Sequence, residues 1–199
     1  MEARTGKTLS PSQREAVDRV LRSKVSVVTG GPGVGKTTLL DTILCVLAAK
    51  GVRLLLAAPT GRAAKRMSEQ TGIEAKTIHR LLEIDPKTSG FRKGPNDPLD
   101  CDLLVIDETS MVDVPLMNAI TKAIPNRSGL LLVGDVDQLP SVGPGRVLAD
   151  VIASGAITVA RLTEVFRQAA ESRIIVNAHQ INRGEMPEWP KAGIESDFY

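Results

Sequence analysis

Cysteine and aromatic residues are scarce in this chain of 199 residues. The only two cysteines, Cys45 and Cys101, lie far apart and fit no metal-binding or redox spacing. We interpret Cys45, which lies in an apolar helical stretch, as a small buried hydrophobic residue. Aromatic residues make up 3% of the chain, too few for a protein that grips nucleic-acid bases mainly by stacking.

Long apolar runs and a strong net charge are also missing. No run approaches the length that spans a bilayer, and the start, MEARTGKTLS, lacks the apolar centre of a signal peptide. We therefore expect a soluble, cytoplasmic protein with no membrane partner. The formal net charge of +2 gives little support for a polyanionic partner, so any nucleic acid would be bound by locally placed donors.

Apolar strands alternate with amphipathic helices along the chain. Strands are expected at residues 24–29, 53–58, 103–106, 129–133 and 157–162. Helices are expected at residues 11–22, 37–50, 77–83, 114–123, 147–153 and 171–182, and one more after Thr60. This alternation predicts an α/β fold in which a parallel sheet carries helices on both faces. Residues 84–100, rich in Pro, Gly, Asp and Lys, interrupt the pattern and predict a small hairpin insertion.

Residues 30–37 fit the phosphate-binding pattern G-x-x-x-x-G-K-[ST] at every defined position. A strand precedes the pattern and a helix follows it, so its backbone N–H groups can cradle phosphate oxygens. We expect Lys36 to reach the β- and γ-phosphates of ATP and Thr37 to coordinate Mg²⁺. The alternative is a glycine-rich turn without a ligand. The predicted loop contacts to nucleotide are Gly31, Gly33, Val34, Gly35, Lys36, Thr37 and Thr38.

Two acids, Asp107 and Glu108, end the apolar strand at 103–106. A strand buried on both faces brings a carboxylate out only at its tip, beside the phosphate-binding loop. We expect Asp107 to hold Mg²⁺ through a water, and Glu108 to orient and deprotonate the water that attacks ATP. The alternative is a pair of acids that stabilises the N-terminus of the next helix.

With these motifs placed, the chain resembles the first RecA-like domain of superfamily 1 helicases, most closely the RecD-like group of exodeoxyribonuclease V alpha-subunit relatives. The resemblance extends from Leu9 to about Pro187. Residues 9–13 are similar to the Q motif, which implies that Gln13 reads adenine, although Gln13 also suits a helix capping box. Residues 134–145, GDVDQLPSVGPG, match motif III, which implies that Gln138 contacts the γ-phosphate or the attacking water.

Other parts of the same resemblance concern a further arginine and the DNA side. Residues 162–168 are similar to motif IV, which implies that Arg167 reaches the γ-phosphate and stabilises charge in the transition state. Residues 58–66 are similar to motif Ia, in which Arg62, Lys65 and Arg66 could equally form a solvated helix face. Residues 77–80 are similar to the next motif, although His79 could equally be a structural histidine. The implied DNA contacts, mostly to the sugar-phosphate backbone, are Pro59, Thr60, Gly61, Arg62, Thr77 and His79.

The resemblance implies an ATP-dependent DNA helicase motor that moves 5′ to 3′ on single-stranded DNA and takes part in DNA recombination and repair. Residues 1–184 would form the ATPase domain and residues 185–199 the start of a following segment, so we interpret the chain as a fragment. Implied partners are single-stranded DNA, a second RecA-like domain of the parent chain and subunits of a nuclease–helicase complex. Two alternatives are a nucleotide-dependent DNA-binding switch without turnover, which Glu108, Gln138 and Arg167 oppose, and an ATPase acting on a protein partner.

Overall fold

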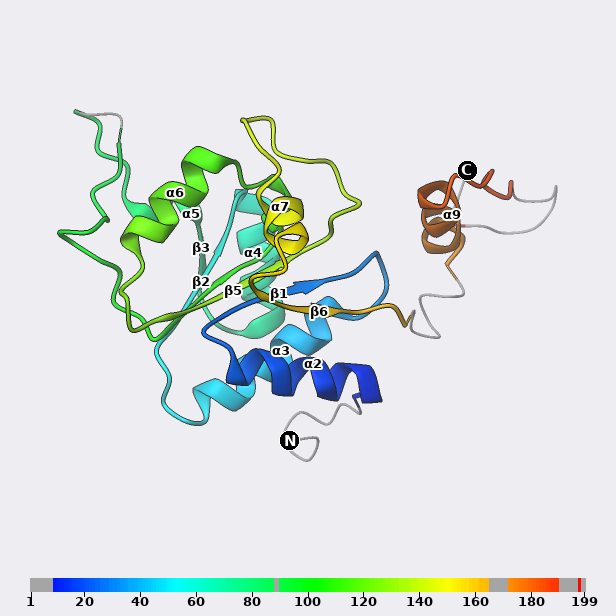
Figure 1. The fold of residues 1–199 in the computed structure, drawn as a ribbon, viewed down its shortest axis with the longest axis horizontal. Coiled ribbons are helices and arrows are strands. Elements are labelled where there is room, and N and C mark those ends of the chain that lie inside the picture. Colours follow the sequence, from blue (N-terminus) through cyan, green and yellow to red (C-terminus); the bar gives the residue numbers. More distant parts are fainter. Residues whose placement is uncertain (1–8, 88–89, 165–171, 190–196, 198–199) are drawn as a thin grey trace.

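The computed structural model of the chain describes residues 9–87, 90–164, 172–189 and 197. Within them, six strands form one parallel sheet in the order β3-β2-β4-β5-β1-β6 (Figure 1). The strands are β1 (Val25–Thr29), β2 (Leu54–Ala58), β3 (Ala75–Thr77), β4 (Leu103–Ile106), β5 (Gly129–Gly134) and β6 (Thr158–Arg161). The helices are α2 (Pro11–Arg22), α3 (Lys36–Ala48), α4 (Gly61–Thr71), α5 (Ile78–Leu82), η1 (Thr109–Met111), α6 (Val114–Ala123), α7 (Val147–Ala153) and α9 (Arg173–Asn182).

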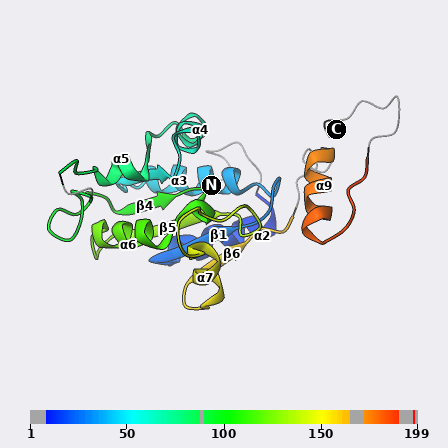
Figure 2. The same cartoon turned by 90° about the horizontal axis from the view of Figure 1, so that it is seen from above.

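Helices cover both faces of the sheet, because neighbouring strand residues point to opposite sides. In β4, Val105 packs on one side with apolar residues of α2, α3 and α4. Leu104 and Ile106 pack on the other side with residues of α5 and α6. Figure 2 shows α3 and α4 on one side of the sheet and α6 and α7 on the other. The α/β fold with a parallel sheet covered on both faces is therefore confirmed.

The carboxyl ends of the parallel strands meet at one edge of the sheet. The loops that leave this edge are residues 30–35 after β1, residues 59–60 after β2, residues 107–108 after β4 and residues 135–146 after β5. Because β5 pairs with both β1 and β4, three of these loops are neighbours in space. This edge is where open parallel sheets bind their ligands.

Two sequence-based expectations differ from the structure. The strand β3 was not expected, because only three residues pair with β2 and they lie at the sheet edge. The interpretation of Cys45 as buried is wrong, since this side chain is exposed. Ile43 and Leu44 of the same helix are fully buried, and the rotation of about 100° per residue turns Cys45 away from them. Among the helices of the described residues, none combines the length and the apolar character of a membrane-spanning segment.

The segment between α5 and β4 contains two isolated antiparallel bridges, Ile84 with Phe91 and Gly94 with Asp97. It projects from the body beside α5 and α6 (Figure 1). The ring of His79 on α5 lies 5.7 Å from that of Phe91, with the two planes at 52°. The ring of His79 thus packs against the projecting segment, which gives this histidine a structural role whether or not it also contacts DNA.

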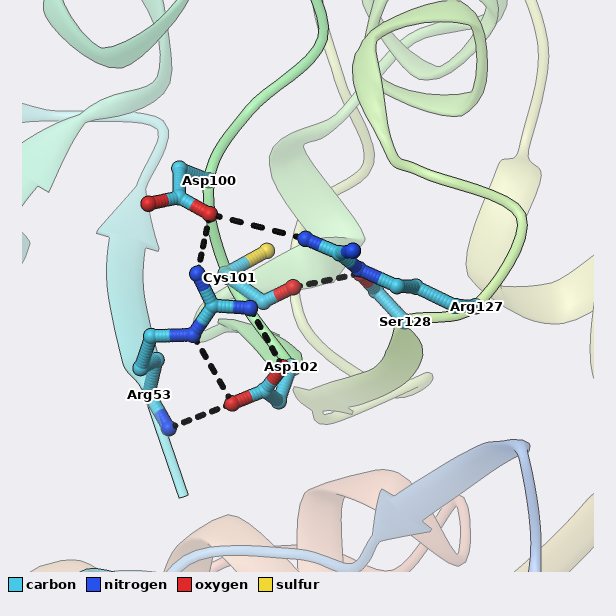
Figure 3. Close-up of polar contacts among 6 residues, drawn as sticks. All are labelled: Arg53, Asp100, Cys101, Asp102, Arg127 and Ser128. Atoms are coloured by element: carbon cyan, nitrogen blue, oxygen red, sulfur yellow. Dashed lines mark hydrogen bonds and ion pairs between the residues drawn. The ribbon is translucent and has the colours of Figure 1, made fainter. Parts of the chain in front are cut away.

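A cluster of charged side chains ties the amino ends of β2, β4 and β5 together, at the edge opposite the loops just described (Figure 3). Arg53 donates to Asp102 from its backbone N (2.9 Å), Nε (3.1 Å) and Nη2 (2.7 Å). It also pairs with Asp100, whose carboxylate lies 3.7 Å from Arg127. Ser128 donates to the carbonyl of Cys101 at 2.6 Å. These contacts join three strand starts that are distant in the sequence.

This cluster should make folding stability depend on acid pH. The hydrogen bonds from Arg53 lower the pKa of Asp102 to about 2. A depressed carboxyl pKa adds stability that is present above the pKa of the unfolded chain, near 3.9, and is lost as the pH falls toward 2. We expect Asp102→Asn to lower the Tm near neutral pH by at most about 4 °C, because the pair is partly solvent-exposed. Thermal unfolding should show that the difference between the two proteins shrinks between pH 4 and pH 2; a constant difference would contradict this account.

Candidate active site

The phosphate-binding loop joins β1 to α3 through two backbone turns that glycine adopts most easily. Gly33 has φ 75° and Gly35 has φ 79°, both in the left-handed region. Within the described residues, no side chain caps the N-terminus of α3, which begins directly at Lys36. The N–H groups of the first helical turn are therefore available to an anion. This arrangement fits a polyphosphate.

Lys36 is held at this loop by polar partners on both sides. Its Nζ donates to the carbonyls of Gly30 and Gly31, the latter at 3.0 Å. Asp135, which is 2% exposed, places Oδ2 3.9 Å from Nζ. Burial lowers the pKa of Lys36, and the carboxylate of Asp135 opposes that shift. The ammonium group is thus a partly desolvated cation beside the loop that would receive the phosphates.

The acidic pair follows β4, as the sequence predicts. The N–H of Asp107 donates to the carbonyl of Ala57 at 3.0 Å and so continues the pairing of β4 with β2. Glu108 adopts φ 51°, a left-handed backbone conformation that residues other than glycine rarely adopt. Its N–H donates to Asp107 Oδ1 at 2.8 Å. Burial raises the pKa of both carboxyl groups. A partly buried carboxylate with a raised pKa is suited to accept a proton.

The loop that carries Gln138 is attached to the segment after the acidic pair. Asp135 accepts hydrogen bonds from the N–H groups of Asp137 at 3.0 Å and Gln138 at 3.3 Å. Farther along, the carbonyl of Pro144 accepts from the N–H of Val114 at the start of α6, at 3.0 Å. Gln138 and Ser110 line one small pocket. The loop therefore bridges the P-loop lysine, through Asp135, and the chain that follows Glu108.

Gln13 forms the capping box that the sequence leaves open, and its role in reading adenine stays a prediction. Its Oε1 accepts from the N–H of Ser10 at 3.1 Å, and its own N–H donates to Ser10 Oγ at 3.3 Å, so the capping box of α2 is formed. Its side chain is buried, yet Nε2 has no hydrogen-bond partner within the described residues. Buried amide groups without partners are rare, so a ligand acceptor is a physical reason for this one.

A groove with three cationic side chains lies between α4 and β3 and reaches the start of α5. The hydroxyl of Thr60 caps α4 by accepting from the N–H of Ala63, and that of Thr77 caps α5 by accepting from the N–H of Arg80, each at 3.2 Å. The groove is lined by Gly61, Ala64, Lys65, Glu74, Ala75, Lys76, Thr77 and Arg80. Gly61 and Thr77, from two motifs predicted to bind DNA, are thus brought together. Pro59 directly precedes Thr60, and Arg62 is exposed on α4.

The sequence profile of the family described as "AAA domain" matches residues 13–144, which is most of the chain. The chain belongs to the AAA domain family.

This AAA domain is similar to curated DNA helicases and helicase subunits. It is 43% identical over 183 residues to the ATP-dependent RecD2 DNA helicase of Deinococcus radiodurans, covering 92% of this chain and 25% of the relative. It is 41% identical over 164 residues to the RecD subunit of the RecBCD enzyme of Mycolicibacterium smegmatis, covering 70% of this chain and 30% of the relative. The chain thus spans less than a third of these relatives. The RecD-like, superfamily 1 assignment is confirmed.

Two solved structures show the same fold. Pif1 helicase from Candida albicans matches with a TM-score of 0.68 and 25% identity, covering 92% of this chain and 46% of that chain. Bacteroides Pif1 bound to ssDNA matches with a TM-score of 0.61 and 25% identity, covering 90% of this chain and 47% of that chain. The RecA-like P-loop arrangement of the sheet is therefore confirmed.

Two charged residues of this AAA domain act on the site although no sequence motif assigns them a role there. Motif III includes Asp135 without a specific task, whereas the structure puts its carboxylate beside Lys36. Motif Ia leaves two readings of Arg66 open, a DNA contact or a solvated helix face. Its positive charge also favours the ionised forms of Asp107 and Glu108 and so opposes their raised pKa. Since charge partners form across the fold, the motif pattern alone did not identify either residue.

The residues of this AAA domain fit ATP with Mg²⁺, by the chemistry of their donors. Uncapped N–H groups and an ammonium group suit phosphate oxygens, and the free amide of Gln13 suits the acceptor edge of adenine. The hydroxyl of Thr37 and the carboxylate of Asp107 are oxygen ligands of the kind that Mg²⁺ prefers. Arg167, predicted to reach the γ-phosphate, lies outside the described residues and stays a prediction.

Replacing Gln13 by glutamate should reduce the preference of this AAA domain for ATP over GTP. Glutamate keeps the acceptor that caps α2 but loses the amide donor, and a site that hydrogen-bonds one base rejects others through such groups. We expect the ratio of kcat/KM for ATP to that for GTP to fall about tenfold. Gln70→Glu, at an exposed position of α4, is the control. An unchanged ratio would restrict Gln13 to its capping role.

Proposed function

We propose that this chain is the ATP-hydrolysing motor domain of a DNA helicase, acting on single-stranded DNA. One observation carries the proposal: a single sheet edge holds both the phosphate-binding set and a basic groove. Lys36, Glu108 and Gln138 follow β1, β4 and β5, while the groove lies beside β2 and β3. Strands β2 and β4 are hydrogen-bonded neighbours. A rearrangement at the nucleotide, beside β4, can therefore reach the groove through this rigid pair of strands.

Each side chain of the phosphate-binding set has a distinct task. Lys36 balances negative charge on the β- and γ-phosphates, with Asp135 orienting its ammonium group. Glu108 accepts the proton of the attacking water, and Gln138 holds that water or the γ-phosphate. Thr37 and Asp107 would hold Mg²⁺, which when bound would supply further positive charge to the phosphate oxygens. Gln13 selects adenine through its free amide.

The groove is proposed to hold the sugar-phosphate backbone of single-stranded DNA. Lys65, Lys76 and Arg80 provide positive charge, and the hydroxyl of Thr77 provides a neutral donor. Such contacts position a strand without reading its sequence. Similarity to a DNA helicase and to an ssDNA-bound Pif1 supports this assignment.

Several features of the whole protein belong to the proposal because the chain spans only part of its relatives. These are a second RecA-like domain, a cytoplasmic location and a role in DNA recombination or repair. A partnership with nuclease subunits follows the RecBCD context of the RecD relatives. Movement is proposed to run 5′ to 3′.

Strand displacement by the full-length protein tests the proposed function. We expect ATP-dependent release of one strand from a duplex with a 5′ single-stranded tail, and at least about tenfold slower release from a duplex with a 3′ tail. A preference for the 3′ tail would reverse the proposed polarity but keep the motor. If neither substrate is opened while ATP is hydrolysed, the proposed helicase activity is wrong.

The projecting segment at residues 84–100 is proposed to act as a wedge at the duplex junction. Deleting residues 87–95 should abolish strand displacement but leave hydrolysis stimulated by single-stranded DNA within about twofold, because the segment follows α5 and lies away from the P-loop. Loss of both activities would contradict the wedge role. Phe91→Ala removes only the ring that packs on His79 and keeps the rest of the projecting segment. Comparing it with the deletion separates loss of the wedge from a disturbance of the DNA groove.

A further inference from the structure

The helix α9 contacts the P-loop, although the two are far apart in the sequence. His179 Nε2 lies 3.1 Å from the carbonyl oxygen of Pro32. The same ring covers Gly31, because a Cβ built on that glycine would lie 2.8 Å from His179 Cε1. Figure 1 shows α9 beside the loop that follows β1. None of the sequence motifs assigns a role to this histidine.

The position of His179 is set by a braced helix. Ser172 caps α9, and Arg173 pairs with Glu188 at 2.6 Å. Asn177, two residues before His179, is fully buried: its Nδ2 donates to the carbonyl of Glu188 at 3.0 Å, and its Oδ1 accepts from the N–H of Glu188 at 3.1 Å. The helix and the chain that returns from it therefore form one unit that presents the imidazole to the P-loop.

The contact fixes the direction of one peptide group in the loop. A carbonyl oxygen can only accept, so Nε2 of His179 carries the proton and donates to Pro32. In a planar trans peptide the carbonyl and the following N–H point in opposite directions. Because the carbonyl of Pro32 faces α9, the N–H of Gly33 points away from α9. Gly33 is also one of the residues that give the loop its left-handed turns.

We propose that His179 is a positioning residue of the nucleotide site, which holds the Pro32–Gly33 peptide so that the Gly33 N–H faces the phosphates. The inference rests on the proposed function, since it requires that the loop binds a nucleotide. It adds a residue of α9 to a site whose hydrolytic residues follow β1, β4 and β5. Loss of the imidazole leaves the peptide free to rotate, so part of the binding energy is used to order it again.

Nucleotide affinity of the full-length protein tests this role. With a fluorescent ATP analogue as probe, we expect His179→Ala to raise the Kd about fivefold, as the loss of one neutral hydrogen bond would. The kcat at saturating ATP should stay within about twofold, because the hydrolytic groups are untouched. His179→Gln, whose amide can donate to the same carbonyl, should restore most of the affinity. Ile181→Ala, at an exposed position of α9, is the control.

Substitution of the glycines gives a second, independent test. Gly31→Ala places a methyl group against the ring of His179 alone, so its effect on Kd should disappear when His179→Ala is also present. Gly30→Ala is the matched control, because its Cβ would lie 2.5 Å from the carbonyl oxygen of Leu162 and 2.8 Å from Val34 Cγ2. His179→Ala should not relieve that damage.

The outcomes separate this inference from the function on which it rests. Tight ATP binding that His179→Ala leaves unchanged, or a Gly31→Ala effect that persists without the ring, would overturn the role of His179 alone. If the unmodified protein does not bind ATP, the proposed function falls and this inference falls with it.

Discussion

Glu108→Gln is expected to lower ATP turnover by about 10²- to 10⁴-fold while leaving ATP affinity nearly unchanged. Glutamine has the same shape as glutamate but cannot take a proton from the attacking water. The N–H of Glu108 that donates to Asp107 is a backbone group and is retained. Steady-state hydrolysis and nucleotide binding by the full-length protein measure the two effects separately.

The matched control for this substitution is Glu83→Gln. Glu83 has a similar left-handed backbone, with φ 56°, but is exposed next to the projecting segment. It should retain full turnover. If Glu108→Gln also keeps full turnover, the proton acceptor lies elsewhere and the assignment of Glu108 is wrong.

The raised pKa of Glu108 leads to two further expectations, one for the pH dependence of turnover and one for folding stability. A general base must be ionised, so turnover should rise with pH through a pKa above that of an ordinary glutamate, about 4.3. Because burial, the largest cause, favours the protonated form, ionised Glu108 costs folding stability at neutral pH. Glu108→Gln should therefore raise the Tm near pH 7, the usual exchange of stability against activity.

Lys36→Ala is expected to lower kcat/KM for ATP by about 100-fold or more, the usual loss when a charged donor to a reacting group is removed. The substitution also leaves the buried carboxylate of Asp135 without its cation at 3.9 Å. We therefore expect a lower Tm as well, since an unpaired buried charge is unfavourable. Lys50→Ala, at an exposed position just beyond α3, should change neither quantity.

The contrary outcome for Lys36 is also informative. If Lys36→Ala retained ATP affinity but lost turnover, Lys36 would stabilise only the transition state and would not contribute to ATP binding. Retention of both affinity and turnover would show that the loop does not bind ATP phosphates through this side chain. A double substitution, Lys36→Ala with Asp135→Asn, should recover stability but not activity, because it removes the unpaired charge without restoring the donor.

Elements with a strong local pattern could be predicted from the sequence. The capping box of Ser10 and Gln13 places the start of α2, and the predicted helix at residues 114–123 has the bounds of α6. Apolar strands with helices between them predict a parallel sheet, because only that arrangement buries both faces of each strand. By contrast, the three residues of β3 are too few to give a pattern, and the apolar surroundings of Cys45 did not show which way its side chain points.

The site could be predicted in its parts but not in its assembly. The P-loop, the acidic pair and the Gln138 loop each have a local signature. Contacts between distant segments have no local signature in the sequence. The pairing of Asp135 with Lys36 and the hydrogen bond of His179 to Pro32 are therefore visible only in the structure. The roles of the predicted site residues themselves await the measurements proposed above.

The most direct test of the central claim is the rate of ATP hydrolysis by the full-length protein with and without single-stranded DNA. We expect stimulation of at least about tenfold, because the nucleotide set and the basic groove share neighbouring strands. Lys36→Ala and Glu108→Gln should each abolish the stimulated rate. Tight ATP binding with hydrolysis that single-stranded DNA does not change would contradict the motor function and leave a nucleotide-dependent switch.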